Sequence, residues 1–124
     1  MKTTVLLVGL GGALGSIMRY LMTYRIICRI TRLPELYGTL AVNVTGCLLI
    51  GIAYGLAERH DWFSPQMRWL ITTGLCGGYT TFSAFTYENV RLLQNGHYGF
   101  CFVYILAGIA LCLAATFAGI MIAG

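Results

Sequence analysis

The chain is short and strongly apolar: 58% of its 124 residues are hydrophobic and only 10% are charged. A soluble domain carries about 25% charged residues, so this composition excludes an ordinary water-soluble protein and favours lipid as the solvent. The formal net charge is +4, but the eight Lys and Arg residues are scattered without a basic stripe or a nucleic-acid motif, so we expect no nucleic-acid partner.

Four long apolar runs predict four transmembrane helices, because a helical span needs about 20 apolar residues. The predicted spans cover about residues 4–27, 37–57, 66–93 and 98–124. Short connections join them, and Pro34, Pro65 and Gln94-Asn95-Gly96-His97 are typical of helix ends and turns. The sequence therefore predicts an all-α membrane protein with a single transmembrane domain, residues 1–124, and leaves no room for a soluble catalytic domain.

The first predicted span contains closely spaced glycines and one cation, Arg19. The run after Met1-Lys2 continues past Arg19 without a clear small-residue cleavage site, so we expect an uncleaved span rather than a signal peptide. Arg19 is a candidate for an ion pathway, or for a side chain that reaches the membrane interface. Pairs of glycines four residues apart, which let helix backbones approach closely, recur along the chain: Gly11/Gly15, Gly51/Gly55 and Gly74/Gly78.

The second predicted span has no charge but contains Asn43. An amide in lipid is costly unless its donors are used. Its NH2 group is able to donate to an anion, and an interhelical hydrogen bond is the structural alternative.

The third predicted span contains a glycine pair, Gly77-Gly78, followed by the hydroxyl residues Thr80, Thr81 and Ser83. Each glycine weakens a helix by about 1 kcal/mol relative to alanine, and hydroxyls bond freed backbone groups. The pattern predicts a helix break near mid-membrane, where freed carbonyls bind a cation and half-helix N-termini face an anion. An unbroken helix with a glycine packing face is the alternative.

Two phenylalanines and one acid follow in the same span. Phe82 and Phe85 are three residues apart and so share a helix face, and the partly positive edges of their rings suit an anion. Two lipid-facing or core rings are the structural alternative. Glu88 is an ionisable residue near the span's end, and it is either functional or paired with Arg19.

The fourth predicted span is uncharged, and the cysteines of the chain have no C-x-x-C or metal-ligand spacing. We expect all five to be small buried apolar residues rather than disulfides or ligands. They are Cys28, Cys47, Cys76, Cys101 and Cys112.

Basic residues are nearly balanced between the two sides of the predicted four-span topology. One side carries Lys2, Arg59 and Arg68, and the other carries Arg25, Arg29, Arg32 and Arg91. The positive-inside rule normally gives a clear bias. This balance fits two alternatives. In one, two oppositely inserted copies pair as an antiparallel dimer, and in the other the protein is an ordinary chain with a weak charge bias.

Three segments together resemble the Fluc (CrcB) family of fluoride channels. They are Gly11-Gly12-Ala13-Leu14-Gly15 with Arg19-Tyr20, Gly38-Thr39-Leu40 with Val42-Asn43 and Gly46, and Gly77-Gly78-Tyr79-Thr80-Thr81-Phe82-Ser83-Ala84-Phe85 with Glu88. The similarity covers most of the chain in the same order, and the Thr-Thr-Phe-Ser-x-Phe element after paired glycines is quite specific.

The resemblance implies a fluoride-selective channel in a bacterial inner membrane, an antiparallel dual-topology homodimer with two pores. Such a channel exports cytoplasmic fluoride by passive conduction and so reduces fluoride toxicity. It implies fluoride donors at Asn43 and Ser83, and pore-lining rings at Phe82 and Phe85. It also implies a structural Na+ held at the dimer centre by the carbonyls of Gly77 and Thr80, and a vestibule near Arg19. Glu88 is grouped with this vestibule.

The fourth span departs from the hydroxyl track that this family often shows at four-residue spacing. Tyr104 fits the track, but Gly108 and Cys112 lack hydroxyls, so that Thr81, Thr116 or water would have to compensate.

Two other functions remain open from the sequence. A small multidrug transporter is also four-helical, but it needs an acidic residue deep in its first span, where this chain has Arg19. A non-transporting membrane subunit is the other. We expect no enzyme, because no nucleophile–base pair is apparent and the only histidines, His60 and His97, lie in predicted loops.

Overall fold

The computed structural model describes residues 1–27, 29 and 34–124. Within these residues the chain forms helices and no strands, as the sequence predicted. The elements are α1 (Lys2–Leu21), the π-helical η1 (Met22–Ile27), α3 (Pro34–Arg59), α4 (Pro65–Arg68), the π-helical η2 (Trp69–Cys76), α5 (Gly77–Tyr79), α6 (Phe82–Gln94) and α7 (Tyr98–Ala123). Two residues named in the predictions above, Cys28 and Arg32, lie outside the described residues.

Three stretches of the described chain are long and apolar enough to cross a membrane: Lys2–Arg25, Leu36–Arg59 and Tyr98–Ala123. Their lengths of 24, 24 and 26 residues exceed the span requirement of about 20. They match the first, second and fourth predicted spans within a few residues. Most large side chains of α1 and α7, such as Leu113 and Phe117, are exposed on the single chain, as lipid-facing helices require.

The third predicted span, residues 66–93, is divided among α4, η2, α5 and α6. Ser64 caps its start by accepting a hydrogen bond from Met67 N (3.2 Å), and Pro65 occupies the first turn as expected. The chain leaves helical geometry at Thr80 and Thr81, which have extended backbones (φ −86°, ψ 159° and φ −150°, ψ 115°). Because no single helix here reaches membrane length, the count of four spans remains a prediction.

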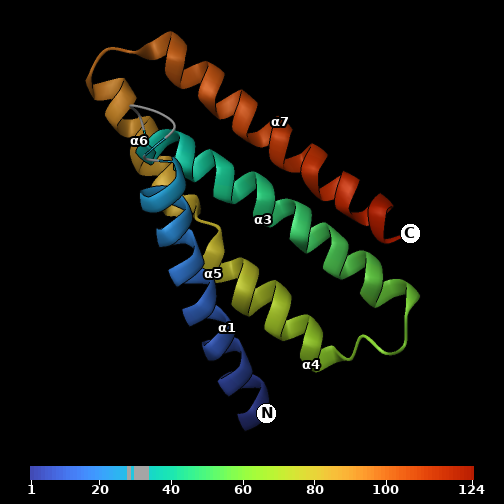
Figure 1. Cartoon of the computed structure of the whole chain (residues 1–124). Coiled ribbons are helices and arrows are strands. Elements are labelled where there is room, and N and C mark those ends of the chain that lie inside the picture. Colours follow the sequence, from blue (N-terminus) through green and yellow to red (C-terminus); the bar gives the residue numbers. More distant parts are fainter. Residues whose placement is uncertain (28, 30–33) are drawn as a thin grey trace.

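The helices pack as two pairs, α1 with η2 and α5, and α3 with α7 (Figure 1). Within each pair the chains run in the same direction, and glycines set the close approach. A Cβ atom added at Gly11 would lie 2.8 Å from the Leu70 carbonyl oxygen, and one at Gly55 would lie 2.7 Å from Ala123 Cβ. The predicted role of the glycine pairs in helix packing is therefore confirmed.

The turn between α6 and α7 follows the predicted glycine. Gly96 has a φ of +79°, in the left-handed region that favours glycine, and α7 begins two residues later. The expectation for the cysteines holds in part. Cys76 and Cys101 are buried, Cys47 and Cys112 are half-buried, and all four are free thiols.

Candidate functional site

The break between α5 and α6 is stabilised by a side chain from α3, Asn43. The Asn43 amide donates through Nδ2 to the Thr81 carbonyl (3.1 Å), and its Oδ1 accepts from Thr81 N (2.8 Å). Both backbone groups of Thr81 are thus bonded although they lie outside any helix. The structural alternative considered for Asn43, a bond between helices, is therefore present, but it serves broken backbone rather than a second side chain. One of the two amide hydrogens remains for another acceptor.

This contact also changes the bonding of the preceding helix end. In a continuous helix, Thr81 N would donate to the carbonyl of Gly77, four residues earlier. Here it donates to Asn43 instead, which diverts it from that carbonyl. Thr80 also has an extended backbone, but its N–H (2.9 Å) and its hydroxyl (2.8 Å) still donate to the Cys76 carbonyl of the preceding helix.

The start of α6 has its own hydroxyl cap. Thr81 Oγ1 accepts from Ala84 N at 3.1 Å, which satisfies one of the free amides at the helix start. The same atom lies 3.3 Å from Ser83 Oγ. Thr81 is buried, whereas Ser83, in the first turn of α6, is exposed on the single chain. An anion is favoured at such an end by the helix dipole.

The two phenylalanines share one face of α6, as predicted from their spacing. Their ring centroids are 6.0 Å apart, and the Phe85 ring is 5.2 Å from that of Tyr104 on α7. Phe82 is 77% exposed, whereas Phe85 is half-buried. The three rings therefore form a continuous aromatic row from the break toward α7.

Gly108, which lacks the hydroxyl expected from the resemblance, makes room for this row. A Cβ atom there would lie 2.9 Å from Phe85 Cε2. Asn43, Phe82 and Cys112 line two adjoining cavities of about 280 and 150 Å³, and Phe85 and Gly108 line the smaller one. At position 108 the ring of Phe85 thus takes the space that a hydroxyl side chain would occupy.

Glu88 is held by hydroxyls from two other helices. Thr39 Oγ1 on α3 donates to its Oε2 (2.7 Å), and the buried Tyr104 hydroxyl lies 2.9 Å from its Oε1 and 3.2 Å from the Leu36 carbonyl oxygen. Thr39 was quoted only as part of a motif and was missed as a functional candidate. The signal that could have found it is a hydroxyl inside an uncharged span, because a buried polar group needs a partner.

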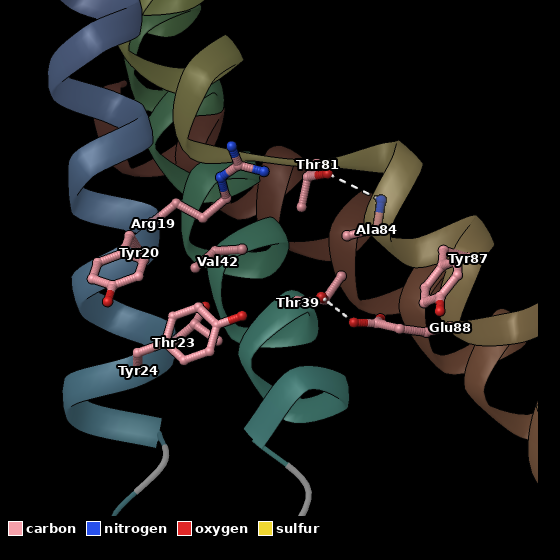
Figure 2. A pocket seen from close by; sticks show the side chains of 10 residues that line it. All are labelled: Arg19, Tyr20, Thr23, Tyr24, Thr39, Val42, Thr81, Ala84, Tyr87 and Glu88. Atoms are coloured by element: carbon pink, nitrogen blue, oxygen red, sulfur yellow. Dashed lines mark hydrogen bonds between the residues drawn. The ribbon is translucent and has the colours of Figure 1, made fainter. Parts of the chain in front are cut away.

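Arg19 and Glu88, the two residues grouped as a vestibule, line one cavity of about 410 Å³, and their role as a vestibule stays a prediction. Figure 2 shows Arg19 extending from α1 toward Thr81, while Glu88 comes from α6 on the other side. Thr39 and Thr81 also line the cavity, together with Tyr20, Tyr24 and Tyr87. Tyr20 and Tyr24 lie on the α1 side and Tyr87 on the α6 side, and a cation and a carboxylate line the same space.

The structure thus brings together Asn43, Thr81, Ser83, Phe82 and Phe85 around the break, and Tyr104 and Glu88 beside it. Thr116, the other position considered in the fourth span, lies far along α7. A Cβ atom added at Gly51 on α3 would collide with the Thr116 carbonyl, so Thr116 lies where α3 and α7 pack against each other.

Comparison with known proteins gives a consistent picture. The sequence model described as "CrcB-like protein, Camphor Resistance (CrcB)" matches residues 6–120. A protein of Flavobacterium psychrophilum named "Fluoride-specific ion channel FluC" is 44% identical over 120 residues, 97% of this chain and 96% of its own length. Proteins of the same name from Gloeothece citriformis (44%; 94% of this chain, 93% of its own length) and Leptospira interrogans (39%; 94% and 91%) are also similar.

These relatives are named as ion channels and not as enzymes, in keeping with the expectation for this chain. The match covers nearly the whole chain and includes all three segments that carried the resemblance. Together with three apolar helices of membrane length, it identifies a multi-pass bacterial membrane protein. The chain belongs to the CrcB-like protein family.

Proposed function

We propose that this protein is a fluoride-selective ion channel that exports cytoplasmic fluoride by passive conduction. The observation that carries the proposal is the group of anion-suited side chains at the helix break: the Asn43 amide, the Ser83 hydroxyl and the Phe82–Phe85 ring pair. The names of the relatives support fluoride as the conducted ion.

Fluoride is small and strongly hydrated, so a pore has to replace its water with hydrogen-bond donors. The second amide hydrogen of Asn43 and the hydroxyl of Ser83 supply them, and Thr81 fixes the position of both through its backbone and hydroxyl. Binding must still be weak enough for release. Ring edges of Phe82 and Phe85 meet this need, because they attract an anion without a full charge.

The cavity lined by Arg19 is the aqueous vestibule of the pathway. A guanidinium there raises the local concentration of anions. Glu88, held by Thr39 and Tyr104, adds negative charge at the inner end and joins the vestibule to the aromatic row. Tyr104, the position that fits the expected fourth-span track, continues the path with its hydroxyl.

The proposed assembly is an antiparallel, dual-topology homodimer with two pores. The weak charge bias of the sequence and the exposure of Phe82 and Gly77 on the single chain support it. Na+ prefers oxygen ligands, and a helix C-terminus favours a cation. Two carbonyls fit such an ion. One is the Gly77 carbonyl, which does not receive the Thr81 N–H because that group donates to Asn43, and the other is the Thr80 carbonyl, which lies outside the helix. We assign them to a structural Na+ shared by two copies.

The direction of flux follows from the membrane potential. A negative interior favours anion exit by about 2.3 kcal/mol per 100 mV. No acidic residue occurs in the middle of a predicted span to couple protons, so conduction is passive. The physiological result is export of fluoride and reduced fluoride toxicity.

The test is fluoride efflux from liposomes that contain the purified protein, measured with a fluoride electrode and beside chloride efflux. Phe82→Ile and Asn43→Asp are the variants, and Tyr98→Phe, exposed at the start of α7, is the control. We expect rapid efflux of fluoride but not chloride, unchanged in the control and lost in both variants. Absence of efflux from folded wild-type protein would overturn the function, and efflux that survives both variants would move the pathway away from these residues.

A further inference from the structure

Two free thiols from different helices line one cavity beside the candidate fluoride pathway. Cys47 lies on α3 and Cys112 on α7. The helices run parallel and nearly touch at Gly51 and Thr116, where an added Cβ would meet a carbonyl. Cys47 and Cys112 are each four residues, one helical turn, before this contact, so the close approach places them at the same level.

Both thiols line the 280 Å³ cavity, together with Asn43, Phe82 and a third cysteine, Cys76, whose side chain is fully buried. Cys112 lines the adjoining 150 Å³ cavity with Phe85 as well. Both are half-buried, so they are neither sealed in the core nor fully exposed to lipid. The thiol pair therefore borders the space through which the proposed conduction runs.

The ligand set selects a particular class of metal ion. Among the described residues, no three His, Cys, Asp or Glu side chains are arranged around one point as a metal site would require. This disfavours ions that need four protein ligands, such as structural Zn²⁺, and hard ions that need oxygen. Two sulfur ligands alone suit soft ions that accept two-coordinate binding, of which Cu⁺, Ag⁺ and Hg²⁺ are examples.

We propose that Cys47 and Cys112 form a two-thiolate site for a soft, thiophilic metal ion in the wall of the pathway, and that its occupation blocks fluoride flux. On binding, each S–H bond breaks, two S–metal bonds form and two protons pass to water, with no change of oxidation state. The blocking effect rests on the proposed channel function, whereas the metal site does not.

The binding test uses Hg²⁺ as the probe and detergent-solubilised protein in which Cys28, Cys76 and Cys101 are replaced by alanine. Mercury–thiolate absorption in the ultraviolet reports binding. We expect one Hg²⁺ per chain that is retained against excess monothiol and removed by a dithiol. Adding Cys47→Ala or Cys112→Ala should weaken retention about 100-fold or more, because two-point attachment raises affinity by about 10²–10⁴.

The control is the reciprocal protein, which keeps Cys28, Cys76 and Cys101 and lacks Cys47 and Cys112; it should lose its mercury to monothiol. If the triple variant does not fold, single Cys47→Ser and Cys112→Ser variants in the natural sequence make the same comparison. Equal retention with one or both of the paired thiols removed would overturn the site.

The flux test adds Hg²⁺ to proteoliposomes. The block is supported if Hg²⁺ stops fluoride efflux and a dithiol, but not a monothiol, restores it. In Cys112→Ala, Hg²⁺ should no longer inhibit efflux. If Hg²⁺ binds tightly and fluoride efflux is unchanged, the proposed block is wrong and the proposed metal site stands. Absence of efflux before mercury is added overturns the channel function, while the absorption measurement still decides the site.

Discussion

The third predicted span and α7 are similar in length and both contain several glycines, yet only α7 is one continuous helix. α7 includes Gly99, Gly108 and Gly119 and remains helical from Tyr98 to Ala123. The third span contains Gly74, Gly77 and Gly78, which are helical themselves. The interruption comes later, at Thr80 and Thr81.

The difference lies in the partners of the backbone. At Thr81, Asn43 Oδ1 accepts from the N–H that would otherwise bond within the preceding helix, and Asn43 Nδ2 adds a second donor to the carbonyl, which as the N-cap of α6 also accepts the first bond of that helix. Among the described residues, no side chain bonds to the backbone of α7. Its Gly119 meets the α3 backbone and its Gly108 meets the Phe85 ring, whereas Gly99 has no atom within 4 Å. Glycine lowers the cost of a break, and a polar partner on another helix decides whether and where it occurs.

Replacement of Asn43 by leucine should have the largest effect. It leaves the buried N–H of Thr81 without its partner, at a cost of about 1–3 kcal/mol, and removes one of the donors to the Thr81 carbonyl. We expect a matching loss of thermal stability in detergent, together with loss of fluoride efflux. Asn95→Leu, at the exposed end of α6, is the control. An unaltered melting temperature in Asn43→Leu would contradict this account of the break.

Gly119→Ala tests the packing of the continuous helix. The new Cβ would collide with the Leu48 carbonyl and lie 2.8 Å from Ile52 N, so α3 and α7 must separate. Such overpacking costs about 1–3 kcal/mol. Gly99→Ala, on the same helix with no atom within 4 Å, should be neutral or stabilising. Thermal unfolding of both variants checks this, and equal melting temperatures would count against the close approach.

Tyr104→Phe tests the link between α7 and the half-helix after the break. It removes the hydroxyl near Glu88 and the Leu36 carbonyl and keeps the ring next to Phe85. Hydrogen bonds between membrane helices average about 0.6 kcal/mol and reach about 1.7. We expect a stability loss in this range from denaturation in detergent, and none in Tyr98→Phe. A loss as large as that in Asn43→Leu would show that the ring contact had also been disturbed.

Gly77→Ala should have the smallest effect. The added Cβ has only the Thr72 carbonyl nearby, at 3.8 Å, and improves helix propensity by less than about 1 kcal/mol. Because Asn43 still holds Thr81, the break should persist. Hydrogen exchange of the amides in residues 77–85 checks this. Protection typical of one unbroken helix in Gly77→Ala would show that glycine, and not Asn43, causes the break.

Much of the site could be anticipated from local sequence. The hydroxyl residues after Gly77-Gly78 indicated a break, and the three-residue spacing of Phe82 and Phe85 placed them on one face; both features are present. The exact residues of the break could not be anticipated, because they depend on a bond between Asn43 and Thr81, 38 positions apart. The Thr39–Glu88 bond joins residues 49 apart and was missed for the same reason.

The sequence by itself determined the solvent and the type of secondary structure of this protein. Its apolar runs of membrane length demand lipid, and lipid demands internally bonded backbone, which makes the chain helical. Only the tertiary structure decided which side chains come together: Asn43 with Thr81, Glu88 with Thr39 and Tyr104, Cys47 and Cys112 around one cavity, and the Phe85 ring against Gly108. These contacts depend on the register of one helix against another, which glycine-mediated backbone approach sets and local composition does not encode.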